Sequence, residues 1–466
     1  MTPYGRAPFI VIWETTRACA LACVHCRAAA IPQRDPRELT TDEGRALIDA
    51  VGRFGDPPPL LVFTGGDPLR RPDLVELVRY ATARGLSASL TPSATGAVTE
   101  ARLRALRDAG LARLAVSLDG ASADVHDAFR GVRGSYRQTL RILERARALG
   151  IPLQINTTVS RRTVGELPAL VRHVEDSGVA LWALFFLIPV GRAGADQALD
   201  AGAIEEVLEW AAGLAERVPF AIKTTEAPHF QRVLARRRGA RGPQPAARRD
   251  AVGRAPRAVT DGNGFVFVDH VGNICPSGFL PLPAGNVRSA DLVEVYRNDP
   301  LFRALRDPDM LTGRCGLCEY RDGCGGSRAR AYAVSGDPLD EDPGCAWRPG
   351  SAAPVMAGGS DAAVPAASSL PGVAAVTPSR AEIDAALESV CDPELGMSVA
   401  ALGLVYDVAI TRGAVRVTMT LTTPGCPLHE VMTEWVRTAL ARVAGVEHVE
   451  VVLTFDPPWT PDRIRR

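Results

Sequence analysis

Between Phe9 and Val190 the sequence alternates short apolar runs with amphipathic stretches of helical period, and this alternation constrains the fold more than any other feature. The amphipathic stretches include 40–54, which opens on a Thr cap, and 71–85, which ends on Gly. The apolar runs are 9–13, 60–64, 86–91, 111–118, 151–159 and 181–190. Strands that are apolar on both faces and alternate with helices predict a parallel sheet, closed or nearly closed into a barrel. We expect functional residues at the carboxyl ends of these strands.

Beyond residue 200 the character of the sequence changes. Residues 203–218 predict a helix, and 231–249 carry many arginines but no Asp or Glu, as in an anion-binding or substrate-covering loop or a solvated insertion. Residues 264–279 predict a β-hairpin with Gly272 and Asn273 in its turn. The almost uncharged stretch 348–379, rich in Ala, Gly, Pro and Ser, predicts a flexible linker. The rest predicts a small α/β domain, with helices at 380–390 and 428–443 and strands at 405–411, 414–422 and 446–455.

Charge and hydropathy argue against several classes of partner. Lys plus Arg and Asp plus Glu number 53 each, so the formal net charge is zero and nothing global indicates nucleic acid or an anionic membrane. The first residues lack the order of a secretory signal, and no apolar run is long enough to span a bilayer. We therefore expect a cytoplasmic protein, whose clustered cysteines are metal ligands or catalytic thiols rather than disulfides.

Three of the ten cysteines, Cys19, Cys23 and Cys26, stand close together on the loop after the first predicted strand. Thiolates with the spacing CxxxCxxC can hold three corners of a 4Fe-4S cubane and leave the fourth iron open. An open iron is typical of a catalytic cluster, because a substrate or cofactor can chelate it. Zinc is the competing metal, but a structural zinc needs four ligands. The only nearby fourth candidate is His25, whose place between two of the cysteines gives poor geometry.

The cysteine spacing resembles the hallmark of the radical S-adenosylmethionine (SAM) superfamily, which lies on the first loop of a partial (β/α)6 barrel. In that superfamily a Gly-Gly-Glu-type motif after the second strand receives the methionyl amino group of SAM. Here "FTGGDPLRRPDL" stands at that place, so the resemblance implies this role for Gly65, Gly66 and Asp67. Glycines there would permit the close approach of the backbone to a ligand.

The resemblance continues after the fourth predicted strand, in "AVSLDGASADVHDAFRGVRGSY". It implies that Ser117 and Asp119 lie at the SAM ribose and that Arg130 pairs with the SAM carboxylate, which a planar guanidinium can bind with two hydrogen bonds. Ser93, Asn156 and Ile188 are weaker assignments to the same cavity, since polar residues at strand ends are often caps.

The resemblance also implies a mechanism. A one-electron donor such as ferredoxin or flavodoxin reduces the cluster, and the electron breaks a carbon–sulfur bond of SAM to give methionine and a 5′-deoxyadenosyl radical. That radical abstracts a hydrogen atom from the substrate. The protein holds the reacting carbon near C5′ and keeps water out.

A second group of cysteines, Cys315, Cys318, Cys324 and Cys345, lies in a loop-rich segment. Alone, it favours zinc and a fully ligated 4Fe-4S cluster about equally. The segment resembles the SPASM or shortened twitch extension, which carries auxiliary clusters, and "CEYRDGCGGSRARAYA" resembles the enzymes of heme d1 and alternative heme b synthesis. Two expected cysteines are absent: Ser327 and Ser277 stand at their places, and Cys275 is either a ligand or a small buried residue.

The C-terminal segment, from "VCDPELGMSVAALGLVYDVAI" to "FDPPWTPDRI", resembles the metal-sulfur cluster assembly domain of SufT-like and PaaD-like proteins. The resemblance makes Cys426 the functional cysteine, with Asp392 and Glu394 near it. Cys426 precedes a predicted helix, whose amides would favour the thiolate, and we count it as a possible metal ligand. Cys391 has weaker support, and Trp459 is expected to pack as part of a structural lid.

Together these observations predict a radical SAM enzyme of the α/β class. Its substrate is expected to be a tetrapyrrole that undergoes oxidative decarboxylation or side-chain removal. The alternatives are a peptide-modifying maturase and an iron–sulfur biogenesis factor that works with assembly proteins. The expected domains are a partial barrel at 1–200, a SPASM/twitch extension at 201–347, a linker at 348–379 and a cluster-assembly-like domain at 380–466.

Overall fold

The fold was established from a computed structural model of the protein. It describes residues 4–241 and 259–350 without a gap, and then 378–388, 390, 397–411, 414–421, 432–433, 436–437, 439–440, 443, 446, 448–457 and 459–463. The chain divides into two compact units, Met1–Ser369 and Leu370–Arg466. Each unit is described by itself.

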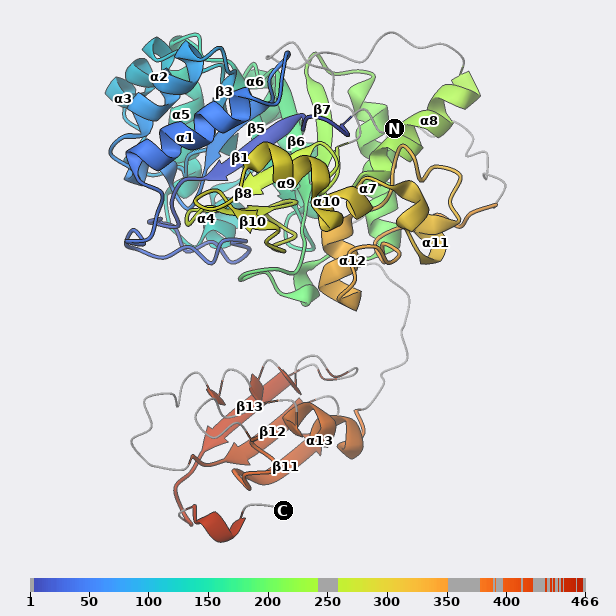
Figure 1. The fold of residues 1–466 in the computed structure, drawn as a ribbon. Helices are drawn as coiled ribbons and strands as arrows, with labels where there is room; N and C mark the ends of the chain where they lie inside the picture. The colour runs from blue at the N-terminus through green and yellow to red at the C-terminus, as the bar shows by residue number, and fades with distance from the viewer. Residues whose placement is uncertain are drawn as a thin grey trace. The chain divides into compact units, whose positions relative to one another are not determined.

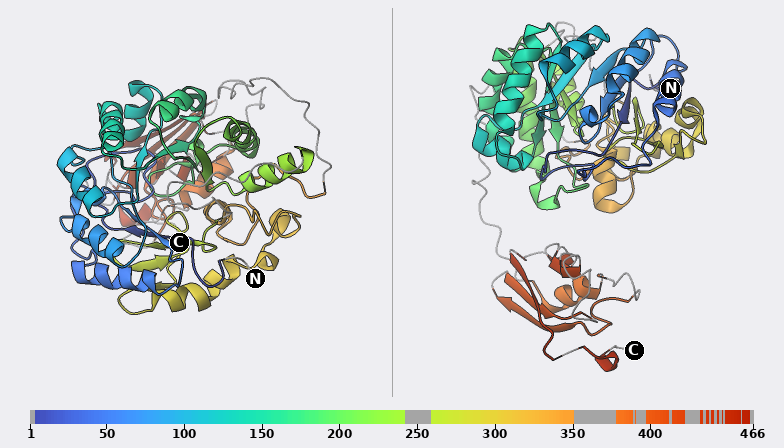
Figure 2. Two further views of the ribbon diagram at one scale, coloured as in Figure 1. Left: turned by 90° about the horizontal axis from the view of Figure 1, so that it is seen from above. Right: turned by 90° about the vertical axis from the view of Figure 1, so that its left-hand side faces the viewer.

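One curved sheet organises the first unit (Figures 1 and 2). Its strands are β1 (Ile10–Glu14), β2 (Leu60–Thr64), β3 (Ala88–Leu90), β4 (Arg113–Ser117), β5 (Leu153–Val159), β6 (Leu181–Phe186), β7 (Ala221–Thr225), β8 (Phe265–Val268), β9 (Asn273–Cys275) and β10 (Gly285–Asn286). Strands β1 to β7 pair in parallel in chain order, and β8 pairs in parallel with the other side of β1. Strands β9 and β10 continue the sheet antiparallel. The sheet ends at β7 and at β10, which confirms a partial barrel.

Helices follow the strands and cover the outer face of the sheet (Figure 1). Those that pack on this face include α1 (Thr41–Gly52), α2 (Leu74–Ala83), α3 (Glu100–Asp108), α5 (Ser135–Ala148), α6 (Leu167–Asp176) and α7 (Ala201–Ala215). The unit also contains α4 (Ala123–Arg130), α8 (His229–Arg241), α9 (Leu292–Asn298), α10 (Pro300–Leu305), α11 (Gly313–Gly316) and α12 (Arg328–Ser335). The predicted cap of α1 is present as a capping box between Thr40 and Glu43. Within the described ranges, no helix is long and apolar enough to cross a membrane.

The main core lies between the sheet and these helices. It includes Trp13 of β1 and Leu77 of α2, both buried completely. A Cβ atom on Gly44 of α1 would lie 2.6 Å from the Trp13 ring, so this helix crosses β1 where only glycine fits. The core thus holds the strands of the barrel rigidly and leaves their carboxyl ends to carry the site.

The structure differs from the sequence-based elements in three places. The segment 231–249, expected as a loop or a solvated insertion, begins within helix α8, which runs from His229 to Arg241. Strand β7 was not predicted, because its residues Lys223, Thr224 and Thr225 are only half buried, and their polar side chains break the apolar run that marks the other strands. The predicted hairpin is present as β8 and β9, but Asn273 is the first residue of β9 and only Gly272, with a φ of +92°, belongs to the turn.

The second unit has its own core, built on α13 (Arg380–Glu388), β11 (Val405–Thr411), β12 (Ala414–Met419) and β13 (His448–Leu453). Strand β12 pairs antiparallel with β11 and parallel with β13. The predicted helix at 428–443 falls largely outside the described residues. Trp459 packs against this core and its Nε1 donates to Leu402 O at 2.8 Å, which supports the expected packing role.

Candidate active site

The loop that carries the first three cysteines leaves the carboxyl end of β1. Cys19 and Cys23 are buried in a small apolar cluster with Leu21, and the half-buried Cys26 packs against that cluster. Backbone amides donate to two of the sulfurs: Leu21 N to Cys19 Sγ at 3.3 Å and Ala30 N to Cys26 Sγ at 3.5 Å. The structure therefore brings the three predicted ligands together at the end of the sheet where the sequence places them.

Gly65, Gly66 and Asp67 follow β2 and lie directly against the cysteine loop. A Cβ atom on Gly65 would lie 2.4 Å from Thr16 O, and one on Gly66 would lie 2.6 Å from Ala18 O. Asp67 N donates to Ala18 O at 2.7 Å. The sequence predicts that these glycines allow close approach to a ligand; the close approach that the structure records is to the backbone of the cysteine loop.

A small cavity of about 110 Å³ lies beside this contact. Five of the residues predicted to bind SAM line it: Gly65, Gly66, Ser93, Ser117 and Arg130. The polar residues that line it and that the sequence did not single out are Thr64, Thr91, His126, Ser135 and Thr139. Ser93 Oγ lies 3.2 Å from Cys19 Sγ and donates to Gly66 O at 2.6 Å, so one hydroxyl connects the cysteine loop, the glycine pair and the cavity.

Arg130, at the end of α4, is held by Asp119. The Arg130 Nε donates to Asp119 Oδ2 at 2.7 Å, and Thr158 N donates to the other carboxylate oxygen at 2.7 Å. Burial raises the pKa of Asp119, but Arg130 and smaller contributions, among them the hydrogen bond from Thr158 N, together outweigh burial and lower the pKa, so Asp119 is ionised. Arg130 Nη1 also lies 3.8 Å from Cys23 Sγ. Asp119 does not line the small cavity and instead orients the guanidinium that does.

Two histidines near the cavity are neutral. Asp119 N donates to His126 Nδ1 at 3.2 Å, so the ring proton is on Nε2, 3.3 Å from Ser135 Oγ. Burial lowers the pKa of His126 to about 4. His25 stacks on Phe129 with ring centroids 4.0 Å apart, and burial lowers its pKa to about 3. His25 is therefore a packed neutral ring in this structure.

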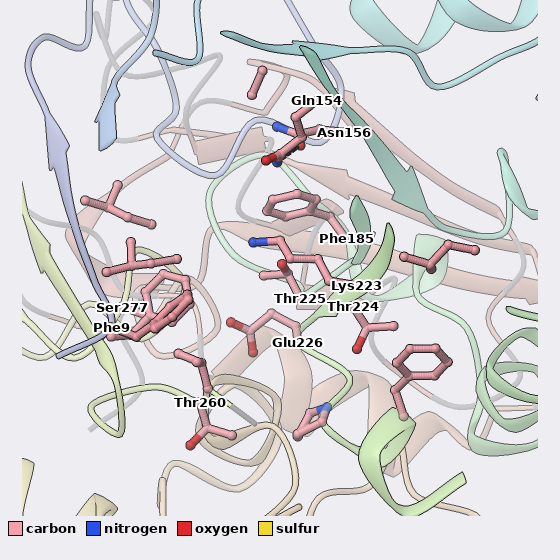
Figure 3. A pocket seen from close by; sticks show the side chains of 18 of the residues that line it. Phe9, Gln154, Asn156, Phe185, Lys223, Thr224, Thr225, Glu226, Thr260 and Ser277 are labelled. Atoms are coloured by element: carbon pink, nitrogen blue, oxygen red, sulfur yellow. Dashed lines mark hydrogen bonds between the residues drawn. The ribbon is translucent and has the colours of Figure 1, made fainter. Parts of the chain in front are cut away.

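A larger cavity of about 670 Å³ occupies the inside of the barrel (Figure 3). Asn156 lines this cavity rather than the small one. Ile188 lines neither, and packs in a separate apolar cluster with Leu280 and Ala329. Thr64 and Thr91, at the carboxyl ends of β2 and β3, line both cavities, so the two cavities adjoin there. A cavity of this size suits an organic ligand.

Arg27, which the sequence analysis did not single out, links the cysteine loop to the large cavity. It lines that cavity, donates to Glu14 Oε2 at 2.7 Å and lies 4.7 Å from the Phe267 ring centroid. His270 Nδ1 lies 3.0 Å from the other Glu14 oxygen. The only sequence signal for Arg27 is its place next to Cys26.

The second group of cysteines also comes together, around α11 and α12. Arg328 Nη2 and Asp342 N donate to Cys315 Sγ at 3.5 Å and 3.3 Å. Burial, with a smaller contribution from Cys315, raises the pKa of Cys345 to about 11, so these thiols lie close to each other. Among the side chains that the structure describes, no three His, Cys, Asp or Glu gather closely enough to hold one metal ion. This holds for Cys19, Cys23 and Cys26 as well, so a single metal ion at either group of cysteines would require side chains to move.

The positions where two further cysteines were expected face the large cavity. Ser277 and Ser327 both line it. Cys275 lies in β9, is 4% exposed, and has its pKa raised to about 12 by burial, which supports its interpretation as a small buried residue. In the C-terminal unit, Cys391, Asp392, Glu394 and Cys426 lie outside the described residues, so their roles remain predictions.

Comparisons with known proteins decide the family. One family model, the radical SAM superfamily, matches residues 13–174, and another, described as iron-sulfur cluster assembly protein, matches residues 380–451. The AdoMet-dependent heme synthase of Methanosarcina barkeri is 40% identical over 350 residues, which cover 75% of this chain and 99% of the relative. The chain belongs to the radical SAM superfamily.

Other radical SAM relatives differ in their named products. The Fe-coproporphyrin III synthase of Methanosarcina barkeri is 30% identical over 355 residues, which cover 72% of this chain and 87% of the relative. The mycofactocin maturase MftC of Mycobacterium ulcerans is 34% identical over 368 residues, which cover 75% of this chain and 90% of the relative. The structure of Streptococcus suis SuiB bound to S-adenosylmethionine matches with a TM-score of 0.57 at 15% identity over 73% of this chain and 78% of that one, which shows the shared fold.

Membership of the radical SAM superfamily implies a 4Fe-4S cluster and SAM, and the residues present fit both. Three thiols with amide donors at two sulfurs are a suitable donor set for three iron corners. Burial raises the pKa of Cys19, so its thiolate needs a nearby cation, which a metal centre supplies. The polar small cavity beside these thiols suits the amino acid part of SAM.

Glycines outside the predicted motif hold the cysteine loop. Gly131, with a φ of +67°, would place a Cβ atom 2.5 Å from Ala22 O. Gly131→Ala should therefore displace the loop and lower the iron content after anaerobic reconstitution severalfold, because backbone strain of about 1–3 kcal/mol adds to the clash. Gly134→Ala is the matched control: its φ is +89°, but a Cβ atom there meets nothing within 4 Å. Equal iron content in the two variants would contradict the prediction.

Proposed function

We propose that this radical SAM protein cleaves SAM reductively at a 4Fe-4S cluster held by Cys19, Cys23 and Cys26, and directs the resulting radical at a tetrapyrrole in the large cavity. The observation that carries the proposal is the junction of the two cavities at Thr64 and Thr91. A molecule that fills the small cavity can reach a second molecule in the large cavity at this junction. Hydrogen abstraction requires such an approach of the two reacting carbons.

The chain's own residues would bind and orient SAM. The glycine pair and Asp67 would receive the methionyl amino group, Ser93 and Ser117 would offer hydroxyls, and Arg130 would take the carboxylate. Asp119 would keep Arg130 in position through the ion pair described above. The family resemblance also assigns Asp119 to the SAM ribose. When bound, the cluster supplies the electron that releases the 5′-deoxyadenosyl radical from SAM. Neutral His126 and the buried wall around it would keep the site free of additional charge and of bulk water.

A tetrapyrrole is favoured by the named products of two relatives, heme and Fe-coproporphyrin III. The size of the large cavity and the aromatic rings of Phe9, Phe185 and Phe267 that line it support a flat organic ligand. The proposed reaction is an oxidative decarboxylation or side-chain removal. The alternative that a specific observation supports is peptide modification, because the mycofactocin maturase covers the same part of the chain.

The second group of cysteines would hold an auxiliary 4Fe-4S cluster. Arg328 and Arg232, both buried, would offset the negative charge of its thiolates. The C-terminal domain, which matches a cluster assembly family, would help to supply or maintain clusters, with Cys426 as a ligand and with assembly proteins as partners. A ferredoxin or flavodoxin would donate the electron, in a cytoplasmic setting that keeps the thiols reduced.

The proposal is tested by reconstituting the protein anaerobically, adding SAM and dithionite, and measuring 5′-deoxyadenosine with and without Fe-coproporphyrin III. We expect 5′-deoxyadenosine in both cases and a new tetrapyrrole product, detected by mass, only with the substrate. Formation of 5′-deoxyadenosine without any change in the tetrapyrrole would contradict the substrate and favour the peptide alternative. No 5′-deoxyadenosine from protein that holds iron would contradict the proposed enzyme.

A further inference from the structure

Two carboxyl groups meet in the wall of the large cavity. Glu226 follows β7 with a φ of +59°, and Asp261 precedes β8. Both residues line the cavity and Asp261 is 3% exposed. Figure 3 shows the Glu226 carboxyl group directed into the cavity, near Thr225 and Thr260. Nothing in the proposed SAM chemistry uses this pair.

The start of α12 holds both groups. Ser327 Oγ donates to Glu226 Oε2 at 2.5 Å, and Ala329 N donates to Asp261 Oδ2 at 3.0 Å. Asp261 Oδ1 is buried and meets no hydrogen-bond donor among the residues that the structure describes. The side chains of Glu226 and Asp261 lie within hydrogen-bond reach of each other, so a proton on either residue would bridge the two groups.

The electrostatics of this wall support a bridging proton. Burial, and then the charge of Asp261, raise the pKa of Glu226 well above its usual value. The guanidinium of Arg330 contacts two acceptors, neither of them the Glu226 carboxyl group. Its Nη2 donates to Glu226 O at 2.6 Å, and its Nη1 pairs with Asp342 at 3.1 Å. His229 is also directed at Asp342, at 2.9 Å. Lys223 of β7, which is close to Glu226 in the sequence, is a further charged side chain that lines the cavity.

We propose that Glu226 and Asp261 share one proton at neutral pH and present a single negative charge to the large cavity, which turns the carboxylates of a bound substrate away from this wall. The proposal rests on the proposed function for its substrate. The proton relieves the repulsion between the half-buried carboxylate of Glu226 and the buried carboxylate of Asp261, and it supplies the donor that Asp261 Oδ1 lacks. The remaining charge repels a substrate carboxylate, so the pair determines which side of a tetrapyrrole faces β7 and α12.

The shared proton is tested by the pH dependence of thermal stability in the reconstituted protein. Glu226 keeps its proton to a higher pH in the folded than in the unfolded chain. Its contribution to stability is therefore full below its ordinary pKa of 4.5 and is lost as the pH rises through the folded pKa. E226Q should not show this loss, because the amide is neutral, can donate to Asp261 Oδ1 and can accept from Ser327. The melting temperature of E226Q should thus increase relative to wild type from pH 5 to pH 9.

Glu216→Gln is the matched control for this experiment. Glu216 also lines the large cavity, but its carboxylate is partly exposed and pairs with Arg237 at 3.4 Å. We expect the melting temperature of this variant to show no increase relative to wild type between pH 5 and pH 9. If the melting temperatures of E226Q and wild type change in parallel between pH 5 and pH 9, no proton is shared and the proposal is wrong.

The effect on the substrate is tested by the binding of Fe-coproporphyrin III, followed by absorbance at pH 8. The double variant E226Q/D261N should bind this carboxylate-bearing probe several-fold to about 10-fold more tightly than wild type, because one buried negative charge is removed. Unchanged or weaker binding would overturn the proposal. Formation of 5′-deoxyadenosine, which reports SAM cleavage alone, should be the same in all variants. If wild type cleaves no SAM, the proposed function fails, and the melting experiment still decides whether the proton is shared.

Discussion

Replacing Cys19, Cys23 and Cys26 together by alanine should reduce 5′-deoxyadenosine formation to the background of the assay. Iron should fall from about eight to about four atoms per chain, because a 4Fe-4S cluster with three protein ligands is lost and the cluster at the second group of cysteines remains. Cys19 and Cys23 contact Ser93 and Arg130, which line the small cavity, and no other cysteine among the described residues shares the apolar cluster of the first three. The measurements are iron and sulfide content after anaerobic reconstitution and 5′-deoxyadenosine after dithionite reduction.

Cys275→Ala is the matched control for this variant. Cys275 is buried in β9, and its high pKa makes it a poor ligand. This variant should keep full iron content and full SAM cleavage, at a stability cost of about 1 kcal/mol for the lost side-chain contacts. Zinc in place of iron in the wild type, or SAM cleavage that survives the triple substitution, would contradict the assignment of the first three cysteines.

Periodicity was sufficient to predict most of the barrel. Strands β1 to β6 bury both faces, so their apolar runs stand out from the amphipathic helices that cover them. Strand β7 carries polar side chains that line the large cavity, so its sequence lacks the continuous apolar run that identified the other strands. The property that hid β7 from sequence analysis is therefore its function as a cavity wall.

The family motifs located residues that line the small cavity, but they did not reveal which other side chains hold those residues in place. The resemblance placed Ser93, Ser117 and Arg130 at one cavity, yet it did not indicate that Asp119 orients Arg130. It attributed the glycines of the loop after β2 to a ligand, but it did not indicate that they also allow this loop to pack on the cysteine loop.

Contacts between distant segments left no signal in the sequence. Arg27 and His270 share Glu14, although more than 240 positions separate these two residues. Glu226 and Asp261 are likewise unremarkable alone, and only the junction of β7, β8 and α12 makes them a pair. Such sites depend on tertiary packing, so spacing rules cannot find them.

Replacing Cys315, Cys318 and Cys324 together by alanine should separate SAM cleavage from substrate turnover. About four irons should be lost, because these thiols would hold the auxiliary cluster together with Cys345. Formation of 5′-deoxyadenosine should persist, since the small cavity and the cysteine loop after β1 belong to other elements. Conversion of the tetrapyrrole should fall to background if the auxiliary cluster accepts or relays the electron that an oxidative reaction releases.

The choice of variant matters because α12 connects the second group of cysteines to the large cavity. Arg328 and Ser327 are consecutive, and they contact Cys315 and Glu226 respectively. A disturbed α12 would therefore also change the wall at Glu226, so tetrapyrrole binding must be measured beside turnover. Lost turnover with unchanged binding assigns an electron-transfer role to the auxiliary cluster. Lost turnover with lost binding assigns a structural role to the segment, and an unchanged iron content would contradict the auxiliary cluster itself.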